Sequence, residues 1–322
     1  MPLSRYIAFQ TQSTFTDETF AAYGANYHPV DPIGEDITGD QQYLYPRTAG
    51  IRNIRGRIQG TKKWSGPLDT PLYPTHAVSL LYYGMGSAVT TTNTPISGVN
   101  THVIKKSNTV PFFRCGIGRD LNEHQYVGGI INSFTVDYSP DEVITASFDA
   151  VFRREKSPLA VLNTSAAFPN YDTVERAFGG TEVAVSIGGS VATFVESLSL
   201  TWENGVADDA YALGNAHLPA GIISTITSTG SMDLRYDNNA RYTDWLAGTT
   251  RAIVLNGTYG TGTAQRRLQF NVPVASYDVN RLPTDNRERY VQTLDFTCTP
   301  DTNSDPIIVT VVNAQTAAQF TG

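Results

Sequence analysis

Cysteine and charged residues are scarce in this chain. Of its 322 residues, 16% are charged and two are cysteines, Cys115 and Cys298. Because an average soluble protein has about 25% charged residues, much of the surface must carry uncharged polar groups. Two cysteines so far apart cannot build a disulfide framework, and we expect both to be buried free thiols.

Long apolar runs and excess positive charge are also lacking. No 18 consecutive apolar residues occur, so we expect no transmembrane helix, and the first residues show no apolar core typical of a signal peptide. The net charge of −7 disfavours a protein that grips nucleic acid, since that affinity comes from Lys and Arg neutralising phosphates. Many hydroxyl and aromatic residues favour β-structure over helical bundles or disorder.

Motifs that mark catalysis or cofactor binding are missing. The five histidines lie at no metal-ligand spacing; His124 is expected in a surface turn. No Gly-x-Ser-x-Gly occurs. The glycine-rich stretch Asn256–Gly262 lacks the Gly-Lys-Ser/Thr of a phosphate-binding loop, so it predicts a hairpin loop. We therefore assign no catalytic, cofactor-binding or metal-binding residues and predict that the chain is not an enzyme.

Apolar and polar residues alternate in many segments, which predicts half-buried antiparallel strands. Phe134–Tyr138 and Ile144–Ala150, joined by a Ser-Pro-Asp turn, form the clearest pair. The same alternation occurs in Val195–Trp202, Ser231–Tyr236, Arg267–Val272 and Thr293–Cys298. The chain is therefore predicted to be mainly β.

Helical periodicity is limited to three short segments. Pro71–Met85 is the first, Asn239–Ala247 with Gly248 as its terminator is the second, and a short third helix is expected over Tyr171–Phe178. The long Gly/Thr-rich stretch Gly86–Asn100 is expected to be a loop that changes conformation on assembly.

The order of elements repeats along the chain. Each half has a strand, then a helix ending at glycine, then further strands, which indicates an internal duplication; two unrelated β domains are the alternative. We expect two tandem β-sandwich or barrel domains, each with a short helix, at residues 49–160 and 161–304. Residues 1–48 and 305–322 are expected to be arms that pack on something else.

Two segments contain candidate assembly residues. Arg52, Arg55, Arg57, Lys62 and Lys63 form the densest basic patch, which suits either a solvated strand face or a contact with an acidic neighbour. The apolar run Pro306–Val312 resembles a strand that needs a partner. The assembly candidates are Arg55, Arg57, Lys62, Lys63, Ile307, Ile308 and Val309.

An ordered series of segments resembles the tail tube (major tail) proteins of long-tailed bacteriophages, in the group with two tube-like halves. The resemblance covers about residues 50–280, and no single motif decides it. The segments are Thr70–Tyr73 leading to Leu80–Gly86, Phe112–Asp120, Gly128–Val136 with Pro140–Phe152, Phe194–Gly205, and Leu218–Gly221.

This resemblance implies a structural virion protein with tail-tube-like domains. Such proteins form rings that stack into a tube, which first encloses the tape-measure protein and then carries DNA without binding it specifically. Two tube domains per chain imply three chains in a pseudo-sixfold ring; without the duplication, six copies are expected. Tail terminator and distal tail proteins are the other implied partners, no membrane is involved, and the tail is assembled in the host cytoplasm.

Electrostatics adds an expectation about the lumen, and two other classes of protein remain open. An acidic or neutral lumen would let DNA slide, whereas a basic one would hold it. Another β-rich virion component, such as a capsid decoration or baseplate protein, is the first alternative. A carbohydrate-binding or hydrolytic protein is the second, and it would need exposed tryptophans; Trp202 and Trp245 are instead expected in the core.

Overall fold

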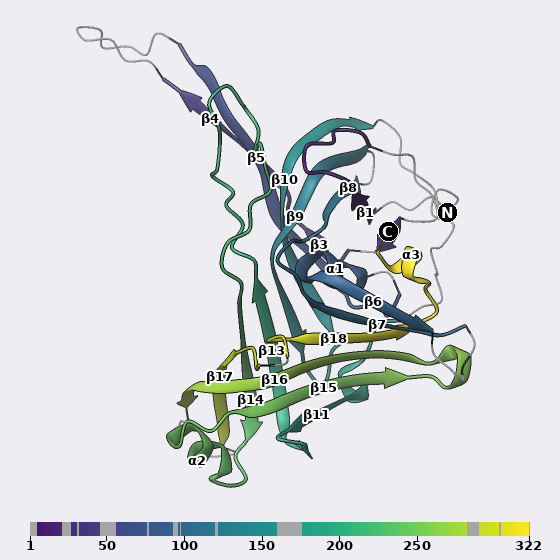
Figure 1. The fold of residues 1–322 in the computed structure, drawn as a ribbon, viewed down its shortest axis with the longest axis vertical. Coiled ribbons are helices and arrows are strands. Elements are labelled where there is room, and N and C mark those ends of the chain that lie inside the picture. The colour runs from purple at the N-terminus through teal and green to yellow at the C-terminus, as the bar shows by residue number, and fades with distance from the viewer. Residues whose placement is uncertain are drawn as a thin grey trace, which may run out of the picture.

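The computed structural model describes most of the chain as an antiparallel β-protein (Figure 1). The described residues are 5–20, 27–30, 32–45, 56–75, 77–92, 96, 98–119, 122–159, 176–281, 290–302 and 304–321. Over these ranges, no helix is long and apolar enough to cross a membrane. The prediction of a mainly β chain is confirmed.

One sheet, here called the main sheet, runs through both halves of the chain. All neighbouring pairs in it are antiparallel. Its strands pair in the order β4 (Thr38–Leu44), β5 (Ile58–Pro71), β10 (Thr145–Leu159), β9 (Asn122–Tyr138), β13 (Val195–Glu203), β14 (Thr227–Arg235), β17 (Val291–Cys298) and β16 (Arg266–Arg281). The antiparallel pair expected around residues 134–150 is β9–β10 and is confirmed.

The remaining strands extend the two longest members of the main sheet. β9 pairs through its first residues with β8 (Phe112–Arg119), which pairs with β1 (Arg5–Gln12), and β1 pairs with β2 (His28–Val30). β16 pairs through its first residues with β15 (Arg251–Tyr259) and β18 (Ile308–Asn313). The smaller strands are β3 (Gly34–Glu35), β6 (Gly86–Thr92), β7 (Asn100–Lys106), β11 (Val183–Ile187) and β12 (Ser190–Val191).

The pairing order of the first half is repeated in the second half. The first half pairs as β4–β5–β10–β9–β8, and the second pairs as β13–β14–β17–β16–β15. A helix follows the second strand in each series: α1 (Ser79–Met85) follows β5, and α2 (Ala240–Leu246) follows β14. The two series are joined because β13 pairs with β9. The domain limits at residues 160 and 304 stay a prediction.

The larger of two hydrophobic core clusters among the described residues contains side chains from both halves. Phe134 and Phe148 of the first half and Trp202 and Leu294 of the second belong to the same buried cluster. Burying each such side chain stabilises the fold by about 1.5–3 kcal/mol, so neither half is independent of the other. Trp202 is fully buried and Trp245 packs partly against this core, as expected.

Both cysteines are buried in the structure. Cys115 and Cys298 are free thiols, as predicted. Burial raises the pKa of the Cys298 thiol to about 12. Near neutral pH this group is therefore a thiol rather than the thiolate that reacts with oxidants.

The helices differ from the sequence prediction in one main respect. The predicted helix Pro71–Met85 is wrong at its start, since Pro71 ends β5 opposite Thr145 and α1 begins only at Ser79. Tertiary pairing with β10 there overrides local periodicity. α2 lies within the predicted Asn239–Ala247, and Gly248 adopts the expected left-handed conformation at φ 61°. Of the third predicted helix, residues 171–175 lie outside the described residues and 176–178 are not helical.

Parts of the predicted loop and of the two predicted arms are strands that pair within the fold. The predicted loop Gly86–Asn100 is wrong over its described ends, because β6 pairs with β7 from Gly86 opposite Lys106 to Thr92 opposite Asn100. Residues 1–48 and 305–322 are predicted to be arms, but β1 pairs with β8 and β2, and β18 pairs with both β16 and β7 of the same chain. α3 (Ala317–Thr321) then packs against α1 and β6.

Candidate functional surfaces

One face of the main sheet is lined by hydroxyl and carboxylate side chains. Directly opposed residues on neighbouring strands share a face, so the pairing register defines rows that cross the whole sheet. One such row consists of Asp69, Ser147, Thr135, Thr201, Thr229 and Thr297. The next row consists of Thr145, Asp137, Ser199, Ser231 and Asp295. We call this surface the polar face.

Hydrogen bonds connect the polar face from strand to strand. The Thr135 and Thr201 hydroxyls are 3.1 Å apart, across the junction between the two halves. Ser197 and Thr293 both donate to the Asp233 carboxylate, at 2.9 and 2.6 Å. Because the carboxylates are already hydrogen-bonded by neighbours, the face is ordered without needing a ligand.

The charges on the polar face are of one sign over most of its area. Its carboxylates are Asp69, Asp137, Asp149, Glu203, Asp233 and Asp295. The sequence has no Lys or Arg from residue 129 to 152 or from residue 177 to 234. Arg235 is the last residue of β14 and pairs with Glu196 at 3.6 Å. Arg281 is the last residue of β16 and pairs with Asp295 at 3.4 Å. The face is therefore acidic.

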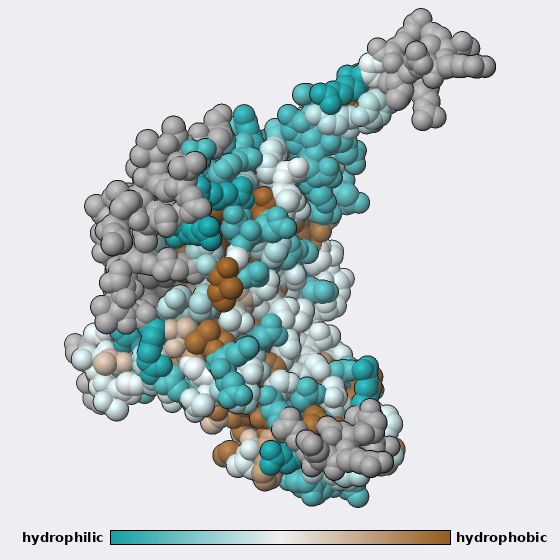
Figure 2. Space-filling view, turned by 180° about the vertical axis from the view of Figure 1, so that it is seen from behind, coloured by the Kyte–Doolittle hydropathy of each residue, from teal (hydrophilic) through white to brown (hydrophobic). Residues whose placement is uncertain are grey.

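The β4–β5 hairpin projects from the body of the molecule and carries the basic residues (Figure 1). The Arg57 guanidinium lies 4.4 Å from the centre of the Tyr43 ring. Lys63 Nζ binds Asp208 Oδ2 at 2.6 Å, and this bond raises the pKa of the Lys63 ammonium. Hydrophilic residues cover most of the hairpin face that is seen in the space-filling view (Figure 2), although Leu44 and Ile58 are exposed apolar residues of the same hairpin. The structure thus places Arg57, Lys62 and Lys63 on one projecting element; Arg55 lies outside the described residues.

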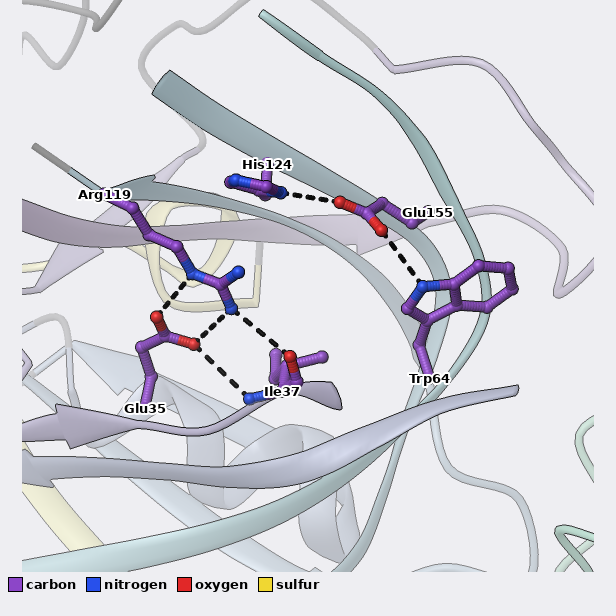
Figure 3. A network of polar contacts seen from close by, with 6 residues as sticks. All are labelled: Glu35, Ile37, Trp64, Arg119, His124 and Glu155. Atoms are coloured by element: carbon purple, nitrogen blue, oxygen red, sulfur yellow. Dashed lines mark hydrogen bonds and ion pairs between the residues drawn. The ribbon is translucent and has the colours of Figure 1, made fainter. Parts of the chain in front are cut away.

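A network of polar contacts fixes the base of this hairpin (Figure 3). Glu155 of β10 accepts hydrogen bonds from Trp64 Nε1 at 3.0 Å and from His124 Nδ1 at 2.6 Å. The prediction of His124 in a surface turn is wrong: it lies within β9, half-buried. The network ties β5 to β9 and β10 at the point where the hairpin leaves the sheet.

A second contact in the same view holds the segment before β4. Arg119 of β8 binds both carboxylate oxygens of Glu35, at 2.5 and 2.6 Å, which is the strong bidentate geometry. The Glu35 carboxylate also accepts from the Ile37 backbone N–H at 3.4 Å. β3 and the start of β4 are thereby attached to β8 (Figure 3).

The apolar assembly candidates of the C-terminal segment lie in the chain's own core. Ile307 and Val309 are buried, and Ile308 is half-buried in β18. Ile307 and Val309 belong to the hydrophobic core, and β18 has a neighbouring strand on each side. Their role in assembly stays a prediction.

A buried polar residue that sequence reasoning missed joins the two halves. Asn204 precedes Gly205 in the sequence, a pair typical of an exposed turn, but its side chain is fully buried. Its Nδ2 donates to the backbone carbonyls of Gly84 at 2.7 Å and Ile131 at 2.9 Å, and its Oδ1 accepts from Trp202 Nε1 at 3.0 Å. No local pattern distinguishes such an asparagine from an ordinary turn residue.

The described part of the chain contains no group of three or more His, Cys, Asp or Glu residues that could hold a metal ion. The extended features of the molecule are instead the acidic polar face and the basic projecting hairpin.

Comparison with known proteins identifies the class that these features define. The sequence profile of the phage tail tube proteins matches residues 6–299. The chain therefore belongs to the phage tail tube protein family, a family of structural tail proteins. No curated protein matches the chain.

Proposed function

We propose that the chain polymerises into stacked rings that form the phage tail tube, with the polar face lining the lumen through which DNA passes. The observation that carries this proposal is the acidic, hydroxyl-rich face that runs unbroken across both halves of the main sheet. Phosphate is repelled by carboxylates and held by Lys and Arg. A wall of Ser, Thr and Asp therefore favours passage over binding, and the chain has a structural rather than a catalytic role.

The internal junction between the two halves suggests how a ring closes. In the repeated pairing order, β13 corresponds to β4 and β9 corresponds to β16. Along Ser276–Arg281 the second edge of β16 has no strand beside it in the described structure; the Trp245 indole of α2 reaches the Asp278 carbonyl there, at 3.3 Å. We infer that β4 of the next chain takes this place, as β13 does beside β9. Closure removes the exposed strand edges.

This equivalence favours three chains per ring. Each chain would contribute two similar groups of strands, so three internal junctions and three junctions between chains would alternate around a pseudo-sixfold ring. In the virion tail such a tube would enclose the tape-measure protein and meet the tail terminator and distal tail proteins at its ends. Assembly would take place in the host cytoplasm.

Electron microscopy and native mass measurement of the purified chain test this proposal together. The expected result is hollow tubes whose end-on averages show six lobes with threefold symmetry, and rings whose mass equals three chains. Six chains per ring would contradict the duplication argument. Discrete particles that never polymerise, or a tube lumen with strongly positive potential, would contradict the tube function.

A further inference from the structure

The connection between β13 and β14, residues 204–226, contains a tight turn near its middle, and this turn has a large apolar residue at its tip. The Asn215 N–H donates to the Ala212 carbonyl at 3.1 Å, which closes a turn with Leu213 and Gly214 at its centre. Gly214 has φ 84°, the conformation that a type II turn requires at its third residue. The Leu213 side chain is fully exposed.

This turn is held firmly against the projecting hairpin. The Lys62 N–H donates to the Ala216 carbonyl at 2.7 Å, and the Tyr211 hydroxyl donates to the Lys62 carbonyl at 3.2 Å. Asp208 adds the ion pair with Lys63. A contact made by a turn that is already ordered costs little further conformational entropy, so Leu213 is presented as a rigid apolar knob.

A small apolar pocket lies at the opposite end of the main sheet. Its volume is about 60 Å³. It is lined mainly by Tyr138, Pro140, Val183, Val185, Val195 and Leu198. Tyr138 is more than nine-tenths buried, and its hydroxyl has no hydrogen-bond partner within the described residues. Because its lining is mainly apolar, the pocket suits an apolar side chain.

The knob and the pocket cannot meet within one chain. Trp64, near the turn, lies opposite Phe152 of β10, and the pocket lies beyond Thr145 at the start of that strand. Seven residues of strand separate these two levels by about 23 Å. The two sites thus lie toward opposite ends of the β5–β10 strand pair.

Charges of both signs lie near the knob, where Asp209 is also exposed, whereas carboxylates border the pocket. Asp141 and Glu142 are exposed in the turn that borders the pocket. Lys62, beside the knob, forms no ion pair with any carboxylate in the described ranges. An ion pair between Lys62 and one of these pocket carboxylates would help to align the two surfaces during encounter.

We propose that Leu213 of one copy inserts into the Tyr138–Val185 pocket of a second copy of this chain in the adjacent ring. This inference rests on the proposed stacking of rings and names the contact between them. A knob on one end and its pocket on the other make a head-to-tail contact that does not close, which is the geometry that generates a filament.

The first test compares the critical concentration for tube formation of Leu213→Ser with that of the wild-type chain. Val89→Ser is the matched control, since Val89 is also an exposed apolar residue, on β6. Leu213→Ser should raise the critical concentration at least about tenfold, because tenfold corresponds to about 1.4 kcal/mol and burying a leucine contributes more than that. Val89→Ser should leave it unchanged.

The second test traps the contact covalently. Single variants Leu213→Cys and Val185→Cys are mixed and oxidised under conditions in which the wild type forms tubes; the native thiols are buried. A disulfide-linked dimer is expected, and the pair Val89→Cys with Val185→Cys should give none. Wild-type tubes together with unimpaired Leu213→Ser tubes and no cross-linked dimer would overturn this inference alone. A wild-type chain that never forms tubes would overturn the proposed function and this inference with it.

Discussion

The Asn204 side-chain amide donates a hydrogen bond to the backbone carbonyl of Gly84 at 2.7 Å, across a sequence separation of 120 residues. Gly84 lies in α1 of the first half, and Asn204 follows β13 of the second. The glycine permits this approach to β9, because a Cβ there would lie 2.8 Å from the Phe134 ring. The two halves are thus joined by a buried polar bond as well as by strand pairing.

Replacing Asn204 by alanine should destabilise the whole chain. The substitution leaves the Gly84 and Ile131 carbonyls without this donor, and each buried group left unsatisfied costs about 1–3 kcal/mol. Urea unfolding should show a single transition whose free energy is lower by about 2–4 kcal/mol. Asn215→Ala, in the exposed turn, is the control and should change little. Equal stability of the two variants would contradict the role assigned to Asn204.

Stability should fall as pH drops below about 6.5, in part through His102. Burial lowers the pKa of His102 below its ordinary 6.5. The ring stacks on Phe320 at 4.0 Å, and its nitrogens bind Thr90 and Asn313, both at 2.8 Å; none of these partners is charged. The unfolded chain therefore takes up the proton more readily, and the stability present above pH 6.5 is lost as pH falls toward the lower folded pKa.

The variant His102→Gln isolates this effect. Its unfolding free energy should depend less on pH between 7.5 and 5.5 than that of the wild type, measured by urea unfolding at several pH values. A smaller dependence should remain, since burial also lowers the pKa of His217. Identical pH profiles for variant and wild type would contradict the assignment to His102.

A positive charge introduced on the polar face should make the tube bind DNA. Ser199 lies between Asp137 and Ser231 in the second row of that face. Tubes of Ser199→Arg should retain a short DNA duplex in co-sedimentation at 50 mM salt and release most of it at 200 mM, because phosphate contacts weaken steeply with salt. Wild-type tubes and Val89→Arg tubes should retain little. Equal retention by both arginine variants would contradict a luminal polar face.

Removing Glu155 should loosen the base of the projecting hairpin. Glu155→Leu deprives both Trp64 Nε1 and His124 Nδ1 of their acceptor, so we expect a loss of about 1–3 kcal/mol and faster amide exchange in β4. Glu142→Leu, at an exposed turn, is the control. Unchanged exchange in β4 would show that strand pairing alone holds the hairpin.

The strands could be predicted because alternation is a local signal. Phe134, Val136 and Tyr138 point to the core exactly where period-two spacing places them. The fate of β18 could not be predicted, since its partners β7 and β16 are far away in sequence and an apolar run looks the same in an arm as in a sheet. Pro71 shows that a local pattern can also mislead. The pattern that follows it predicts a helix, but Pro71 pairs with β10 as part of a strand.

The sequence predicts that each strand has a polar side, but it does not predict how far these polar sides join into one face. Alternating Ser, Thr and Asp indicate a solvated side of each strand, whereas only the register shows that these sides align over both halves. Leu213 carries no pattern at all, because its importance depends on the turn geometry and on a pocket formed by distant residues.

The β4–β5 hairpin and the 204–226 connection occupy corresponding places in the repeated pairing order, yet they differ in length and chemistry. One is a basic ribbon, and the other ends in a single apolar tip. Because the 204–226 connection lies against the hairpin of its own chain, a ring of three chains would present one protrusion per chain, made of both parts. Such a ring would fit the next one only at rotations 120° apart. A rotation of 60° would place every protrusion away from its binding site on the next ring. Divergence of the two halves would in this way fix the angular order of the entire tube.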